Sequence, residues 1–236
     1  MNESITNISF TQLTIIFIPA GMVIGLLYSW SLEWKSAAYA MARMVVQLLL
    51  IGYCLTYIFE SDTASITVGI LSIMIFAASW IALRTVPENR KTYFHFALIS
   101  ILAGGGITLL LVTQFVLKLN PWFLPRYMIP LAGMIFASSM NGVSLAAERL
   151  QAEMDRGESY LNSRGIALRA ALIPITNSLF AVGLVSLPGM MTGQILSGIS
   201  PLIAVRYQIM VMCMIFSAVG FSAALFLHLI RTKYLK

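Results

Sequence analysis

The chain alternates between long runs without charged residues and short polar segments. Seven such runs stand out, at 4–32, 44–59, 63–83, 92–117, 127–147, 170–205 and 207–230. About 20 apolar residues form a helix that is long enough to cross the hydrocarbon core of a bilayer. The pattern therefore predicts an all-α integral membrane protein, with about seven transmembrane helices in a single transmembrane domain over 1–236.

The segment 31–43 differs from the runs on either side because it mixes charged and apolar residues. Glu33, Lys35 and Arg43 are interspersed with Trp34 and other apolar side chains. A helix with this pattern lies along the bilayer surface with its apolar side in the lipid. We expect an interfacial elbow helix here, joining the first two spans.

The run 170–205 is long enough for one or two crossings, and Pro188 and Gly189 interrupt it. Proline removes a backbone donor, and glycine permits conformations closed to other residues. Irregular backbone at membrane depth is tolerated only where protein or a watery cavity covers it. We therefore expect one interrupted crossing, at a substrate pathway or a tight helix contact. The candidate pathway residues are Pro188, Gly189, Met190, Met191 and Gln194, with Met134 and Asn141 of the fifth span as further candidates.

Basic residues near the span ends predict the orientation of the chain, because cytoplasmic loops are enriched in Lys and Arg. They gather in the first, third and fifth loops and after the last span. Acidic residues occupy the N-terminus and the second loop: Glu3, Glu60 and Asp62. We predict an external N-terminus and a cytoplasmic C-terminus at Lys236. Three basic residues break this pattern: Lys118, Arg126 and Arg206.

The composition supports a membrane protein, since 59% of the residues are hydrophobic and 10% are charged. Soluble domains carry about 25% charged residues. A net charge of +6 would fit nucleic-acid binding in a soluble protein, but here it reflects membrane orientation, and we expect no nucleic-acid partner. Cys54 and Cys213 lie inside apolar runs, which favours packing over a disulfide or a metal site.

Catalytic chemistry is not evident in the predicted spans. Buried carboxylates, which proton- or sodium-driven carriers and intramembrane hydrolases use, are missing from 63–83, 92–117, 127–147 and 170–205. The Gly-Lys pair of the Walker phosphate loop occurs nowhere. We therefore expect a non-enzymatic chain that binds no cofactor. If the chain is an active transporter, another polypeptide hydrolyses the ATP.

Metal-ligating groups are sparse in the predicted spans. Met190 and Met191 offer thioethers, which bind soft metal ions, but neither Cys nor His lies beside them in the sequence. His95 and His228 lie near predicted span ends, where an interfacial position is the simpler interpretation. The sequence assigns no metal site.

The densest charged stretch is 148–169, which has eight charged residues, four of each sign. Glu153 and Arg156 have the i, i+3 spacing of a helical ion pair, and Gly157 interrupts the helix. A solvated helix is the plain interpretation. A helix, break and helix in the cytosol would also suit docking on an ATPase. The candidate coupling residues are Glu153, Arg156, Gly157, Glu158 and Arg164.

Several segments together resemble one known family. They are Arg169-Ala-Ala-Leu-Ile-Pro174, then 182–194 with its core Leu187-Pro-Gly-Met-Met191, then 207–211, with further agreement at 43–53 and 128–134. Over nearly its whole length the chain resembles the permease of the bacterial iron-export ABC transporter. This FetB family also includes the plant aluminium-sensitivity membrane protein.

The resemblance implies a multi-pass permease in the cell inner (plasma) membrane, working as a homodimer. Each copy would sit on a separate ABC ATPase subunit, which uses ATP and Mg to export iron or another metal. Two other classes stay open on the residues alone. They are an autonomous channel or carrier and a membrane scaffold protein.

Overall fold

The computed structural model describes residues 8–60 and 63–234. Glu3, Asp62 and Lys236, used above to predict orientation, lie outside this described part. The described residues form helices, with one isolated β-bridge between Val182 and Ser186 and no strand, which confirms the all-α prediction. The chain divides into two compact units, 1–60 and 61–236, which are described separately.

The first unit contains α1 (Phe10–Ile15), α2 (Phe17–Ser29) and α3 (Trp34–Glu60). The expected separate elbow helix at 31–43 is not confirmed, because 34–43 forms the first turns of α3. The physical reason is that neither Gly nor Pro occurs between Trp34 and Ile51, so nothing ends the helix. The chain reverses before α3 at Ser31, whose φ is 55°.

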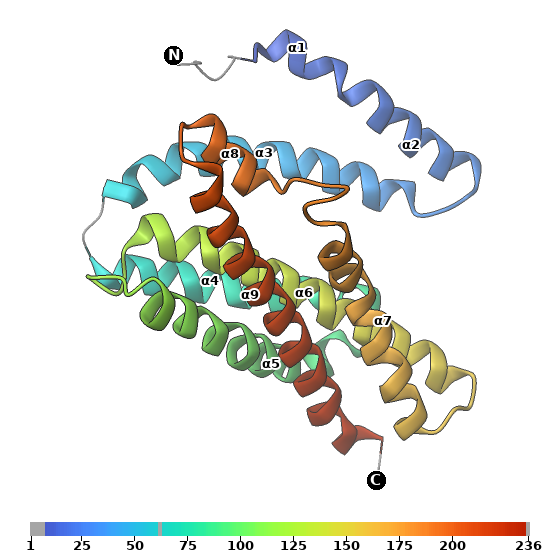
Figure 1. The fold of residues 1–236 in the computed structure, drawn as a ribbon. Coiled ribbons are helices and arrows are strands. Elements are labelled where there is room, and N and C mark those ends of the chain that lie inside the picture. The colour runs from blue at the N-terminus through green and yellow to red at the C-terminus, as the bar shows by residue number, and fades with distance from the viewer. Residues whose placement is uncertain (1–7, 61–62, 235–236) are drawn as a thin grey trace. The chain divides into compact units, whose positions relative to one another are not determined.

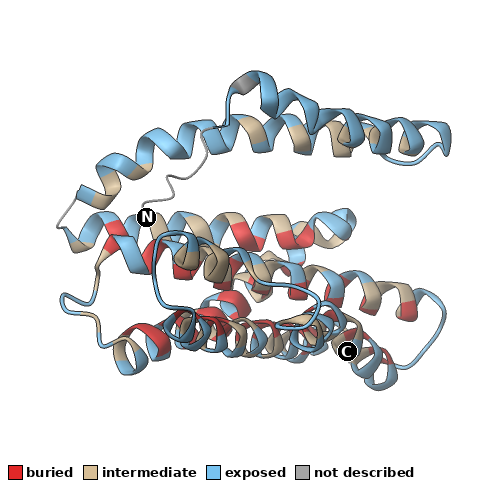
Figure 2. Cartoon of the chain, turned by 45° about the horizontal axis from the view of Figure 1, so that its top comes forward, coloured by how far each residue is buried: buried red, intermediate tan, exposed pale blue. Residues whose placement is uncertain are grey.

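The second unit contains the remaining helices (Figure 1). The longer ones are α4 (Ala64–Ala82), α5 (Arg90–Leu110), α6 (Pro125–Asp155), α7 (Tyr160–Ala181), α8 (Gly189–Leu196) and α9 (Pro201–Leu229). The short ones are η1 (Leu83–Thr85), η2 (Pro87–Asn89), the π-helix η3 (Leu111–Val116) and η4 (Ile230–Lys233). Figure 2 shows the buried positions on this unit, whereas α2 and α3 have none among their described residues.

Small residues let α9 pack closely against α5 and α6 in the second unit. A Cβ added at Gly104 of α5 would lie 2.7 Å from the backbone nitrogen of Ser222 on α9. A Cβ added at Gly142 of α6 would lie 2.8 Å from a methyl carbon of Val219. Ser139 also donates a hydrogen bond of 3.3 Å to the carbonyl of Ala218. The three helices therefore form a rigid core beside which α7 and α8 lie.

Six helical segments of the described chain are long and apolar enough to cross a membrane, so the protein is a multi-pass membrane protein. They are Thr11–Ser29, Trp34–Glu60, Ala64–Thr85, Pro87–Val116, Pro125–Asp155 and Pro201–Lys233. The predicted count of seven is not confirmed, because α7 is not among them. Its first half carries Arg164 and Arg169, and its helix ends at Ala181, so it lacks a long uncharged stretch.

The predicted interruption of 170–205 is present, but it begins earlier than expected. Helix α7 ends at Ala181, and the amides of Val185 and Ser186 both bond back to the Ala181 carbonyl. Gly183 has a φ of +84°, which favours glycine. Pro188 is the N-cap of α8 and not a break within a helix. Replacing Pro188 alone would therefore not join α7 to α8.

Candidate functional site

One cavity of the second unit lies between α6, α8 and α9, and we call it the upper pocket. Its volume is about 680 Å³. Three predicted pathway residues, Met134, Met190 and Gln194, line it together. Its other lining residues are Leu117, Arg126, Tyr127, Pro130, Leu131, Ile199, Ile203, Tyr207 and Met210. Figure 1 shows α8 beside the start of α9, which explains how 190 and 194 reach a cavity that α6 also borders.

A second cavity, of about 340 Å³, lies where α7 ends and α8 begins. Pro188 and Met191 line it, together with Gln208, Met212 and Cys213 of α9. Met190 and Met191 thus face different cavities, because successive helical residues point about 100° apart at 3.6 residues per turn. The fold also brings Cys213 to the same cavity as Met191, which their separation in the sequence conceals.

A third cavity, of about 310 Å³, lies between α6, α7 and α9 and is lined by Asn141. Met212 lines both this cavity and the second one. The three cavities follow one another along α9, at 203–210, 205–213 and 212–219. Gly189, the first residue of α8, is exposed. The predicted pathway residues are therefore distributed along α9 and not gathered at one point.

The cavities offer amide, aromatic and sulfur groups. The side-chain oxygens of Gln194 and Gln208 are buried and accept no hydrogen bond within the described chain. The described residues contain no group of three or more His, Cys, Asp or Glu side chains that would hold a metal ion. Sequence reasoning missed Arg126, Tyr127 and Tyr207 as lining residues. The one signal for them was the position of Arg126 as an exception to the charge pattern.

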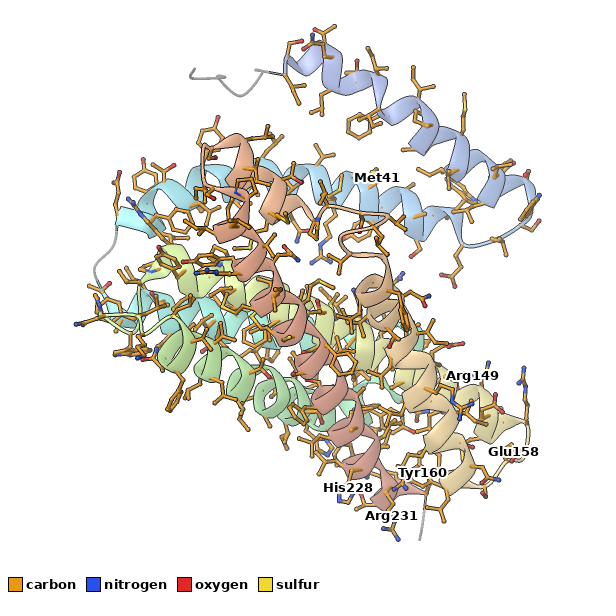
Figure 3. All side chains as sticks on the ribbon, in the orientation of Figure 1. Met41, Arg149, Glu158, Tyr160, His228 and Arg231 are labelled. Atoms are coloured by element: carbon orange, nitrogen blue, oxygen red, sulfur yellow. The ribbon has the colours of Figure 1, made fainter. Side chains whose placement is uncertain are left out.

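The predicted helix, break and helix at 148–169 is present. Helix α6 ends at Asp155, Gly157 has a φ of +87°, and Ser159 caps α7 by accepting a bond from the Asn162 amide. Arg156 and Glu158 are exposed, while Arg164 is half-buried. Figure 3 shows Glu158 at the tip of this turn. The turn thus presents charged side chains to solvent at one end of the second unit.

Glu153 differs from the solvated charge that its sequence context predicts. Its carboxylate pairs with Arg149 at 2.6 Å and, as predicted, with Arg156 at 3.1 Å. The residue is only 5% exposed. Its two partners are more accessible, since the side chains of Arg149 and Arg156 are 39% and 66% exposed. Glu153 therefore fixes the end of α6 and does not itself form part of the exposed surface.

Tyrosines join the charged turn to the helical core. Tyr160, the first residue of α7, donates a hydrogen bond to the Leu227 carbonyl of α9 and stacks on Tyr234 at 5.5 Å. The Tyr234 hydroxyl lies 2.7 Å from that of Tyr93 on α5. Figure 3 shows Tyr160 near Arg231.

Known proteins are similar in sequence to most of this chain. The model of the uncharacterised protein family UPF0014 matches residues 10–235. The probable iron export permease protein FetB of Escherichia coli is 33% identical, covering 99% of this chain and 93% of the relative. Protein ALUMINUM SENSITIVE 3 of Arabidopsis thaliana is 34% identical, over 78% of this chain and 72% of that protein.

A UPF0014 membrane protein of Synechocystis is 35% identical, over 75% of this chain and 74% of the relative. No solved structure matches the chain. The matches to FetB and to the plant protein confirm the resemblance drawn from the segments at 169–174, 182–194 and 207–211. The chain is a member of the UPF0014 family, whose model spans all of its described helices.

Proposed function

We propose that this chain is the membrane-spanning permease subunit of an ABC transporter that exports iron or another metal. The observation that carries the proposal is the charged turn between α6 and α7, exposed at Arg156 and Glu158 and tied to α9 through Tyr160. The similarity to the FetB iron export permease supports it. The chain itself would catalyse no reaction and bind no cofactor, and a separate ATPase would use ATP and Mg.

The proposed docking surface consists of Arg156, Gly157, Glu158 and Arg164, held in place by the buried Glu153. A force applied to the turn by an ATPase would reach α9 through the Tyr160 hydrogen bond and α6 through the Glu153 ion pairs. Buried, hydrogen-bonded contacts transmit displacement because they resist local rearrangement. The turn is therefore suited to convert ATPase movement into movement of the helices that line the cavities.

The topology proposal counts α7 as a seventh crossing. It starts at the charged turn and ends beside α8, so its 22 residues run for about 33 Å at 1.5 Å per residue. With this crossing, the N-terminus lies outside the inner membrane and the C-terminus in the cytoplasm. A reporter that works only in the cytoplasm should therefore be active when it is fused after the last residue. A reporter active only in the periplasm would contradict this topology.

The proposed homodimer explains the exposed loop between α7 and α8. Leu184 and Val185 are 90% and 84% exposed, on irregular backbone within a predicted membrane run. Exposed apolar side chains that lie together on a surface mark contact sites for another protein or for the membrane. A second copy seated on this loop would cover these side chains and would enclose the cavities lined by 188–194 as a pathway.

Co-purification with the cognate ATPase tests the proposal. The chain and the ATPase should form a stable complex, and ATP hydrolysis should rise above that of the ATPase alone. Glu158→Lys should reduce this stimulation, while Glu33→Lys, a matched reversal on the first unit, should leave it unchanged. An autonomous channel or a scaffold would give no stimulation with the wild-type chain.

A further inference from the structure

The charge of the upper pocket is opposite to that expected for a metal-ion site. Among its lining residues, Arg126 alone carries a charge. Arg126 forms no ion pair with the described acidic residues, since the ion pairs of the described chain both involve Glu153. A guanidinium stays charged at any physiological pH. A bare metal cation entering this pocket would meet a positive charge and no carboxylate.

The position of Arg126 on α6 adds a second source of positive potential at the pocket. Arg126 is the second residue of α6, directly after Pro125, so it lies at the helix N-terminus. The partial positive charge of a helix N-terminus favours anions there. Two independent sources of positive potential, a guanidinium and a helix end, thus act on one cavity.

The size and walls of the pocket indicate an organic ligand. Its volume of about 680 Å³ lies within the usual range for organic ligand sites, roughly 300–1,000 Å³. Met134, Ile203 and Met210 provide apolar wall, and Tyr127 and Tyr207 provide aromatic surface. The Gln194 oxygen accepts no hydrogen bond from the described residues, so a ligand hydroxyl or amide would satisfy it.

We propose that the upper pocket binds an organic anion with an apolar body, whose carboxylate or phosphate pairs with Arg126. The planar guanidinium forms two parallel hydrogen bonds with such groups. As a statement about the transported substrate, this rests on the proposed function. A metal that leaves by this route then travels as an anionic organic complex. The same chemistry belongs to two sources, a soluble organic acid and an anionic phospholipid.

Binding to the purified chain in phosphatidylcholine nanodiscs, without any ATPase, tests the inference. The probe is radiolabelled 2,3-dihydroxybenzoate, an aromatic carboxylate with hydroxyl donors, and its neutral counterpart is catechol. The variant is Arg126→Gln. The matched control is Arg206→Gln, which removes an exposed arginine of α9 that does not line the pocket. Ile203→Trp fills the pocket without changing charge, and it serves if Arg126→Gln does not fold.

Arg126 is exposed and water screens its pairing, so Arg126→Gln should weaken carboxylate binding roughly fivefold. Arg206→Gln should stay within about twofold, and Ile203→Trp should abolish binding. Catechol should bind more weakly than the carboxylate, and its affinity should be the same for wild type and Arg126→Gln. Displacement of the probe by added phosphatidylglycerol in the wild type identifies the lipid as the source. An unchanged probe affinity identifies a soluble acid.

The inference is overturned if wild type and Arg126→Gln bind 2,3-dihydroxybenzoate equally. It is overturned as well if neither 2,3-dihydroxybenzoate nor phosphatidylglycerol binds in a way that depends on Arg126. It is also overturned if Fe³⁺ alone binds and Ile203→Trp blocks it. Failure of the proposed function is distinguishable, because that would appear as absent ATPase stimulation with Arg126-dependent anion binding intact.

Discussion

Replacing Tyr160 by Phe should loosen the charged turn from the helical core while leaving the ring in place. The hydroxyl of Tyr160 donates to the carbonyl of Leu227, and the two residues are 4% and 0% exposed. Leu227 lies in the last turn of α9, where carbonyls lose their regular helical partners. The substitution therefore leaves a buried acceptor without its side-chain donor.

An unsatisfied buried acceptor costs about 1–3 kcal/mol. For chains of roughly 150–250 residues, each kcal/mol lowers the midpoint of thermal unfolding by about 2–4 °C, so we expect a decrease of about 2–12 °C. If the turn couples the ATPase to α9, stimulation of ATP hydrolysis should also fall. It should fall even at temperatures where the variant remains folded.

The assay compares unfolding midpoints and ATPase stimulation of purified wild type, Tyr160→Phe and Tyr57→Phe. Tyr57 is the matched control, because it is 77% exposed and its hydroxyl bonds to none of the described residues. The control should behave as wild type. An unchanged midpoint in Tyr160→Phe would refute the structural reasoning. A lowered midpoint with full stimulation would refute the coupling role of the tyrosine.

Three further predictions follow from the packing, the ion pairs and the cavities. Gly104→Ala should lower the unfolding midpoint, because its Cβ would lie 2.7 Å from the Ser222 nitrogen, whereas Gly69→Ala, with nothing within 4 Å, should not; equal midpoints would contradict the close packing. Glu153→Gln should reduce the free energy of unfolding by about 1 kcal/mol, because Arg149 and Arg156, partly exposed at 39% and 66%, lose their carboxylate partner, while Glu158→Gln should stay within about 0.5 kcal/mol; equal losses would contradict a structural role for the Glu153 ion pairs. Single cysteines at 190, 191 and 194, in a variant lacking Cys54 and Cys213, should react with a water-soluble thiol reagent, and nucleotide with the ATPase should change the rate; inert cysteines in every state would move the pathway elsewhere.

The sequence predicted the helical class and most of the spans well, because hydrophobic length is a direct physical requirement of the bilayer. It also predicted the break at Gly157, because glycine readily adopts the positive φ found there. The separate elbow helix expected at 31–43 is not confirmed, because the charges in this segment do not prevent α3 from beginning at Trp34 and continuing through it. Sequence reasoning also misplaced the start of the second break, which depends on Gly183 as well as on Pro188.

The candidate site was only partly predictable. Met190 and Gln194 are four residues apart on one helix, so helical spacing correctly placed them on one side of α8. Met191 and Cys213 share a cavity only because α8 folds back beside α9, and no local pattern encodes that contact. The burial of Glu153 likewise depends on its surroundings in the fold, since Arg149, Asp155 and Arg156 nearby in the sequence suggest a solvated segment. Tertiary contacts therefore account for what sequence reasoning missed.

ATP-driven transport into inverted vesicles tests the central claim most directly. Vesicles containing the chain and its ATPase are supplied with ⁵⁵Fe, alone and with 2,3-dihydroxybenzoate, and accumulation is measured with ATP and with a non-hydrolysable analogue. We predict accumulation that requires ATP, the ATPase and an intact turn, so that Glu158→Lys lowers it while the permease remains folded. Accumulation that continues without ATP, or without the ATPase, would show an autonomous carrier and contradict this account.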